Sequence, residues 1–140
     1  MIERRISRQD NVTEMSWATM SKNITLSDSE YRVMSIVWRH GGEACAREIA
    51  DELLAMDGLS RGASYTLIHR CLEKGVLRRD DPGFHCVAIL SQSDAQHTEV
   101  RKLIKDLFDG SASSLATTLL SSDFLTPDEA ADLQKRIQEM

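Results

Sequence analysis

The stretch Ser60–Arg79 reads SRGASYTLIHRCLEKGVLRR, and it decides the fold. It opens with a serine, which caps helix N-termini well, and Gly75 ends the helical pattern because glycine accepts a left-handed backbone. Between them, apolar residues recur at helical spacing, which predicts a helix that reaches Lys74 and buries one face. The side chains of that buried face are Leu67, Ile68, Cys71 and Leu72. After the glycine, Val76–Arg79 is typical of a strand.

The opposite face of this predicted helix is polar and basic. The side chains that project away from the core are Arg61, Tyr65, Thr66, His69 and Arg70. Residues 61–79 hold five basic side chains against one acid, although the chain as a whole carries a net charge of −5. Residues 93–140 hold nine acids against five basic side chains. Such asymmetry is typical of a protein in which one part meets nucleic acid, and the alternative is a solvated face with a chance run of charge.

Further predicted elements flank this helix on both sides. They are helices over residues 28–40 and 46–56, a turn over 80–83 and a strand over 84–90. Ser27 and Glu30 have the spacing of a capping box at the start of the first helix. Three helices followed by a hairpin are typical of a winged helix-turn-helix. We therefore predict a mainly α fold with a small β-hairpin, a winged helix-turn-helix followed by a C-terminal helical dimerisation region.

The predicted elements suggest how such a fold would bind DNA. The major groove of B-DNA is about 12 Å wide and admits one α-helix, so the third helix would enter it while the second crosses the backbone. The hairpin, or wing, would approach phosphates beside the groove. The aspartates at its turn, Asp80 and Asp81, oppose that contact, so we expect the wing to bind weakly. The predicted DNA-binding residues are Arg61, Tyr65, Thr66, His69, Arg70, Lys74, Arg78 and Arg79.

The last third of the chain has the pattern of amphipathic helices. Apolar residues of the segment 93–108 fall on one helical face, and Thr126-Pro127-Asp128-Glu129 marks the start of a last helix. Short helices are marginal in water, so their apolar faces need a cover, either a second chain or the winged helix of the same chain. We predict a homodimer held by Val100, Leu103, Ile104, Leu107, Phe108, Leu115, Leu119, Leu133 and Ile137. Two recognition helices would then read two half-sites.

Four segments carry a family resemblance: LSDSEYRVMSIVW (26–38), AREIADELL (46–54), YTLIHRCLEKGVLRR (65–79) and FHCVAILSQSD (84–94). Together they resemble the penicillinase-repressor and methicillin-repressor family, which also contains the copper-responsive repressors. The resemblance implies a homodimeric repressor in which Thr66 and Arg70 match residues that contact operator DNA. The predicted function is therefore a sequence-specific DNA-binding transcriptional repressor that acts as a homodimer on a pseudo-palindromic operator.

The chain also departs from the resemblance. Family members that respond to β-lactams are cut at an Asn-Phe bond by a sensor protease, and the resemblance implies such a partner. This sequence contains no Asn-Phe, and Lys102-Leu103 stands at the matching place. The copper-responsive members carry Cys-x-Cys pairs near the C-terminus, where this chain has no cysteine. The alternative is a ligand- or metal-responsive regulator without proteolytic control.

Other functional classes find little support in the sequence. Catalytic and nucleotide-binding motifs are absent, which predicts that the protein is not an enzyme and needs no cofactor. No metal-ligand spacing joins the histidines and cysteines, which are His40, His69, His85, His97, Cys45, Cys71 and Cys86. A winged helix that binds another protein instead of DNA is a further alternative.

The sequence also predicts a location and a division of the chain. Without an apolar segment behind the N-terminal arginines or a run long enough to span a bilayer, we expect a cytoplasmic protein that makes no membrane contact. We divide it into a mobile N-terminal extension (1–22), a DNA-binding domain (23–91) and a dimerisation region (92–140).

Overall fold

The computed structural model describes residues 24–121 and 123–140, so the predicted extension over 1–22 lies outside the described residues. The elements in chain order are α3 (Asp28–Arg39), β1 (Glu43–Cys45), α4 (Ala46–Asp57), α5 (Arg61–Glu73), β2 (Leu77–Asp80), β3 (His85–Ala88), α6 (Gln92–Leu107), α7 (Ala112–Leu120) and α8 (Pro127–Gln138). The chain divides after Thr98 into two compact units. The assignment of DNA binding and dimerisation to different regions stays a prediction.

Local capping explains where the first helices begin. The Ser27 hydroxyl accepts from the Glu30 amide at 3.1 Å, while the Glu30 carboxylate accepts from the Ser27 amide at 2.8 Å. Helix α5 starts in a related way, with the Ser60 hydroxyl accepting from the Ala63 amide at 3.2 Å. Gly75, with φ of 78°, follows the end of α5 in the left-handed region. The predicted starts of both helices are therefore confirmed.

The core lies where α3, α4 and α5 meet. Its fully buried side chains include Met34 and Val37 of α3, Ile49 and Leu53 of α4, and Ile68 and Cys71 of α5. The predicted inner face of α5 is confirmed, since Leu67 and Leu72 also pack in or against this core. Ala95 in the first turn of α6 belongs to the same core, so the core extends past the end of the wing.

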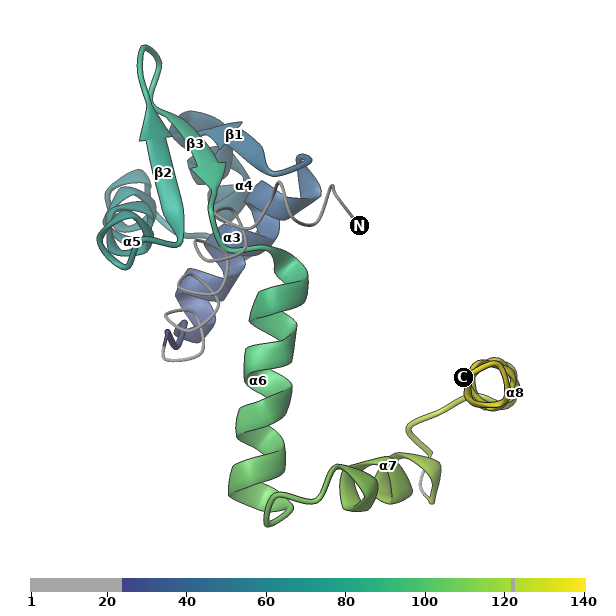
Figure 1. Ribbon diagram of the computed structural model, residues 1–140. Coiled ribbons are helices and arrows are strands. Elements are labelled where there is room, and N and C mark those ends of the chain that lie inside the picture. The colour runs from purple at the N-terminus through teal and green to yellow at the C-terminus, as the bar shows by residue number, and fades with distance from the viewer. Residues whose placement is uncertain (1–23, 122) are drawn as a thin grey trace, which may run out of the picture. The chain divides into compact units, whose positions relative to one another are not determined.

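A three-stranded antiparallel sheet in the order β1-β3-β2 covers one side of the helices. Ala44 of β1 and Arg79 of β2 both pair with Cys86 of β3, so the three residues share one face of the sheet. Leu77 and Cys86 are buried on that face. In Figure 1 the β2–β3 hairpin extends beyond the helices, and α5 lies beside β2. The hairpin confirms the predicted wing, whereas β1 is a third strand that the sequence did not indicate.

A partly buried ion pair fastens the C-terminal end of α5 to the start of α3. The Lys74 ammonium lies 2.6 Å from the Glu30 carboxylate and 2.6 Å from the Thr25 carbonyl oxygen. Only 5% of the Glu30 side chain is exposed. Burial raises the pKa of Glu30, but hydrogen bonds from Lys74 and from the Ser27 amide outweigh it, so the pKa lies below its ordinary value of 4.5. This carboxylate is therefore ionised at neutral pH.

The second unit has no core of its own within the described residues. Of the residues of α6, α7 and α8, only Ala95 is buried, and it belongs to the first unit. Helix α8 begins at the predicted place, with the Thr126 hydroxyl accepting from the Glu129 amide at 3.1 Å. Leu133 and Ile137 of α8, which we predict to hold the homodimer, are 39% and 65% exposed in the single chain. Packing among the described residues of one chain therefore leaves both side chains open to solvent.

The Glu30–Lys74 pair yields a first prediction. Replacing Glu30 with Gln should lower the free energy of unfolding by about 1 kcal/mol near neutral pH, because the ion pair is lost while an acceptor for Ser27 remains. Since the pKa of Glu30 is lower in the folded protein, its contribution is present above 4.5 and is lost as pH falls through the folded-state value.

Urea unfolding of both proteins at several pH values tests this. The difference in the free energy of unfolding between the wild type and Glu30→Gln should shrink in acid. Asp132→Asn, which breaks an exposed pair with Arg136 in α8, is the control and should leave the free energy of unfolding close to that of the wild type, because exposed ion pairs contribute little to stability. A difference that stays constant or grows as pH falls below 4.5 would contradict the role given to Glu30.

Candidate nucleic-acid interface

The outer face of α5 is polar and open to solvent. Thr66, His69 and Arg70 are exposed, while the opposite side of the helix is packed in the core. The Thr66 hydroxyl donates to the Gly62 carbonyl oxygen at 3.0 Å, one turn earlier, so its oxygen keeps the capacity to accept a hydrogen bond. One helix thus offers a hydroxyl, an imidazole and a guanidinium to a partner.

Tyr65 lies at the margin of this face. The prediction that it projects away from the core is wrong, because the side chain is half-buried and packs against the core. Its ring meets that of Phe84 at the end of the wing's turn, with centroids 5.7 Å apart and an interplanar angle of 76°. The His69 ring also lies 5.7 Å from Phe84. Phe84 therefore joins the wing to two successive turns of α5.

Arg79 completes the cluster at Phe84. Its guanidinium carbon lies 3.7 Å from the centre of the Phe84 ring, a cation–π contact. Because Arg79 shares a sheet face with Cys86, its side chain emerges on the side of the sheet that faces the helices. Its Nε donates to the Asp81 carboxylate at 3.0 Å. The structure therefore brings Tyr65, His69 and Arg79 together around one ring.

Arg78 lies on the opposite face of the sheet. It donates two hydrogen bonds to Asp80, at 2.9 and 3.0 Å, and these bonds raise the pKa of Arg78 and lower that of Asp80. Arg78 pairs with Val87 across the strands, and Asp80 pairs with His85. The structure therefore separates Arg78 from the cluster at Phe84, although the two wing arginines are adjacent in sequence.

Two further predicted residues are also held by acids. Arg61, the first residue of α5, lies 3.2 Å from the Asp51 carboxylate of α4, and both side chains are more than half exposed. Lys74 is engaged with the buried Glu30 described above, so it belongs to the packing of α5 rather than to its open face. Arg70 forms no ion pair with any of the described residues.

The thiols and histidines offer no competing site in this part of the chain. Burial raises the pKa of Cys71 to about 12 and that of Cys86 to about 11, which keeps both protonated and unreactive. His85 lies 2.6 Å from Glu43, and His40 is paired with Glu52. Among residues 24–121 and 123–140, no three side chains of the metal-binding types gather in a cluster that could hold a metal ion.

The comparisons with known proteins bear on this surface. The family model for the penicillinase repressor matches residues 26–139 of the chain. The chain belongs to the penicillinase repressor family. The methicillin resistance regulatory protein MecI of Staphylococcus aureus is 26% identical over 116 residues, which cover 81% of this chain and 94% of that protein. The penicillinase repressor of Bacillus licheniformis is 25% identical over 122 residues, which cover 86% and 94% of the two chains.

Part of this chain is also similar to a solved structure. The solution structure of the DNA-binding domain of the repressor BlaI is 28% identical, covers 50% of this chain and 87% of that domain, and has a TM-score of 0.46. The predicted family is confirmed by the family model, as is the prediction that the protein is not an enzyme, since that family is one of repressors. Within the described residues, no helix combines the length and apolar character needed to cross a membrane.

Phe84 and Asp51 are the residues of this surface that sequence reasoning missed as functional positions. The sequence predicts that Asp81 opposes contact between the wing and phosphates, but it does not link Asp81 to Arg79. Phe84 follows the turn of the wing. An aromatic residue directly after Gly83 could have indicated a contact between the wing and α5. Its φ of 51° is uncommon for a residue other than glycine, and the ring contacts with α5 accompany this conformation. Asp51 lies ten residues before its arginine partner, and no spacing rule links the two.

The contact between Phe84 and Arg79 yields a second prediction. In a double-mutant cycle of Phe84→Leu and Arg79→Ala, the coupling free energy from urea unfolding should be about 0.5–1 kcal/mol, because leucine fills space but has no π face for the guanidinium. A parallel cycle with Arg78→Ala should give coupling near zero, since Arg78 lies on the other sheet face. Equal coupling in the two cycles would refute the arrangement.

Proposed function

We propose that this protein represses transcription by binding, as a homodimer, to a pseudo-palindromic operator. The observation that carries the proposal is the outer face of α5, where Thr66, His69 and Arg70 stand exposed on a helix whose other side is fixed in the core. The wing lies beside this helix. Membership in the penicillinase repressor family, and the similarity to a regulatory protein and a repressor, support the same function.

The chemistry of the exposed face suits a DNA major groove. Arg70 can donate two parallel hydrogen bonds to a guanine, and Thr66 can contact either a base edge or a thymine methyl group. His69 and the Arg79 guanidinium on Phe84 are placed to approach phosphates beside the groove. An interaction module for proteins would instead present apolar anchors on this helix, and its exposed side chains are polar.

The second unit supports association of two chains. Its helices expose large apolar side chains and bury none, and short helices without a covered face are marginal in water. The most exposed of the predicted dimer residues are Val100 (43%), Leu107 (71%) and Ile137 (65%). The others are Leu103, Ile104, Phe108, Leu115, Leu119 and Leu133, which are half-buried or exposed. A second copy of the same unit is the cover that we propose.

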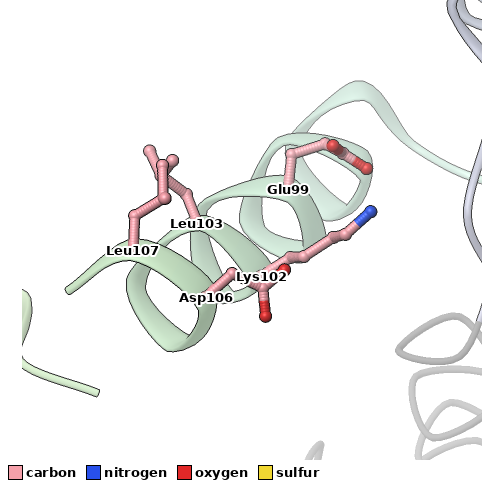
Figure 2. A pocket seen from close by; sticks show the side chains of 5 residues that line it. All are labelled: Glu99, Lys102, Leu103, Asp106 and Leu107. Atoms are coloured by element: carbon pink, nitrogen blue, oxygen red, sulfur yellow. The ribbon is translucent and has the colours of Figure 1, made fainter. Parts of the chain in front are cut away.

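One face of α6 illustrates this arrangement. A shallow hollow is lined by Glu99, Lys102, Leu103, Asp106 and Leu107. Figure 2 shows the side chains of the two leucines next to each other and those of Glu99 and Lys102 directed away from them. An apolar strip with charged residues beside it is typical of a helix that packs against another helix in an oligomer.

The first test of this function is DNA binding. Duplex DNA from the promoter region of the protein's own gene should bind with an affinity that falls steeply with salt, because phosphate contacts release counterions. Thr66→Ala combined with Arg70→Ala should weaken binding at least about tenfold, since a good base contact is worth about 1–3 kcal/mol and each dimer loses two sets.

Fluorescence anisotropy with Arg136→Ala as the control completes this test. Arg136 lies in α8 with its guanidinium on Asp132, so its loss removes the same charge from the second unit and leaves the residues of α5 unchanged. Binding that ignores salt, or that survives the double substitution, would contradict the proposal.

The second test is the oligomeric state. Leu107→Asp places a charge on the apolar strip of α6 and should shift the full-length protein from dimer to monomer in sedimentation velocity experiments, because a charge buried at an interface is costly. Leu54→Asp is the matched control: this leucine of α4 is also exposed, at 55%, but lies in the first unit. A wild-type monomer, or a dimer unaffected by Leu107→Asp, would count against the proposed interface.

A further inference from the structure

Two arginines beside the exposed face of α5 are paired with aspartates of the same chain. Arg61 at the start of the helix lies 3.2 Å from Asp51, and Arg79 of the wing lies 3.0 Å from Asp81. All four side chains are well exposed, from 42% for Arg79 to 60% for Asp81. These carboxylates therefore stand in water, at the place where a DNA phosphate would meet the arginines.

A carboxylate and a phosphate bind a guanidinium through the same kind of interaction. Both are anionic acceptors of its N–H groups, and both bind arginine best through short, charge-assisted hydrogen bonds. In the pair with Asp81, the Nε–H of Arg79 is already in use. A phosphate that approaches Arg79 must displace this carboxylate or bind beside it, where the two anions repel each other.

We propose that Asp81 is a built-in competitor of DNA phosphate, which holds Arg79 on the wing and limits sequence-independent binding to DNA. The inference rests on the proposed function. Arg79 is fixed from two sides, by the Phe84 ring below its guanidinium and by the Asp81 carboxylate at its Nε, so the arginine is positioned for a phosphate before one arrives. The carboxylate lowers the affinity that this positioning would otherwise give.

The proposal does not extend to the neighbouring ion pair in the wing, Arg78 with Asp80. Arg78 and Asp80 form an even better pair, with two hydrogen bonds, but on the sheet face away from Cys86 and from the cluster at Phe84. Asp80 therefore competes for an arginine that does not adjoin the outer face of α5. The two aspartates are adjacent, exposed and equal in charge, so they form a matched pair for experiment.

The experiment compares Asp81→Asn with Asp80→Asn in the full-length protein. Each is measured with promoter DNA of the protein's own gene and with a shuffled duplex of the same length, over a series of salt concentrations. Asp81→Asn should bind the shuffled duplex about threefold to tenfold more tightly at low salt. The plot of log affinity against log salt should steepen by about 0.9 for each protomer, because one more phosphate contact counts fully.

The controls separate charge from structure. Asp80→Asn should stay within about twofold of the wild type, because its arginine lies on the other sheet face. Asp81→Glu keeps a carboxylate beside Arg79 and should behave as the wild type, which excludes an effect of the turn alone. Thermal melts followed by circular dichroism check that each variant folds as the wild type does.

Two results would overturn the inference. One is an Asp81→Asn variant with the affinity and salt dependence of the wild type. The other is an equal gain in both asparagine variants, which would mean that only the net charge of the wing matters. If the wild type binds neither duplex, the proposed function itself is contradicted and the inference falls with it, whereas unchanged affinities in a wild type that binds promoter DNA refute the inference alone.

Discussion

Helix α5 has to bury one side in the core and leave the other side exposed to a partner. The rest of the winged-helix unit depends on this constraint. Within thirteen residues, Ile68 and Cys71 are fully buried while Thr66 and Arg70 are exposed. Polar side chains can remain in water at fixed positions only if the apolar side is held by close packing, because packing is what makes the helix rigid. The ion pair of Lys74 with Glu30 then fastens the end of the helix, and Phe84 fastens the wing to its middle.

In the winged-helix unit, individual ion pairs matter more than the net charge of the chain. The chain carries a net charge of −5, and the basic residues near α5 are mostly matched with acids: Arg61 with Asp51, Arg78 with Asp80 and Arg79 with Asp81. A protein that binds DNA through unmatched positive charge would bind any sequence, since phosphates are the same everywhere. Matched arginines leave discrimination to the side chains that reach bases. The acidic wing that argues against DNA binding at first is thus compatible with selective binding.

The sequence predicts the helices well because their ends are set by neighbouring residues. Ser27 with Glu30, Ser60 and Gly75 act within one turn of the chain, so spacing alone reveals them. Contacts between distant residues leave no such signal. Strand β1 has three residues and owes its existence to pairing with β3, and Lys74 reaches Glu30 across 44 positions. Ser64 is fully buried in α5, with a hydroxyl that has no partner among the described residues, and no pattern of polar residues would place it inside.

The second unit explains why association and DNA binding belong together in the proposed function. Because α7 and α8 bury no side chain within the described residues, the apolar faces of this unit would gain their cover in the proposed dimer, and folding of the unit and dimerisation would then be one equilibrium. A single α5 reads few base pairs, while two copies joined in a dimer add their binding free energies without a second loss of translational entropy. Occupancy of the operator then depends on protein concentration more steeply than for a monomer. Any signal that opens the second unit would release the DNA without touching α5 or the wing.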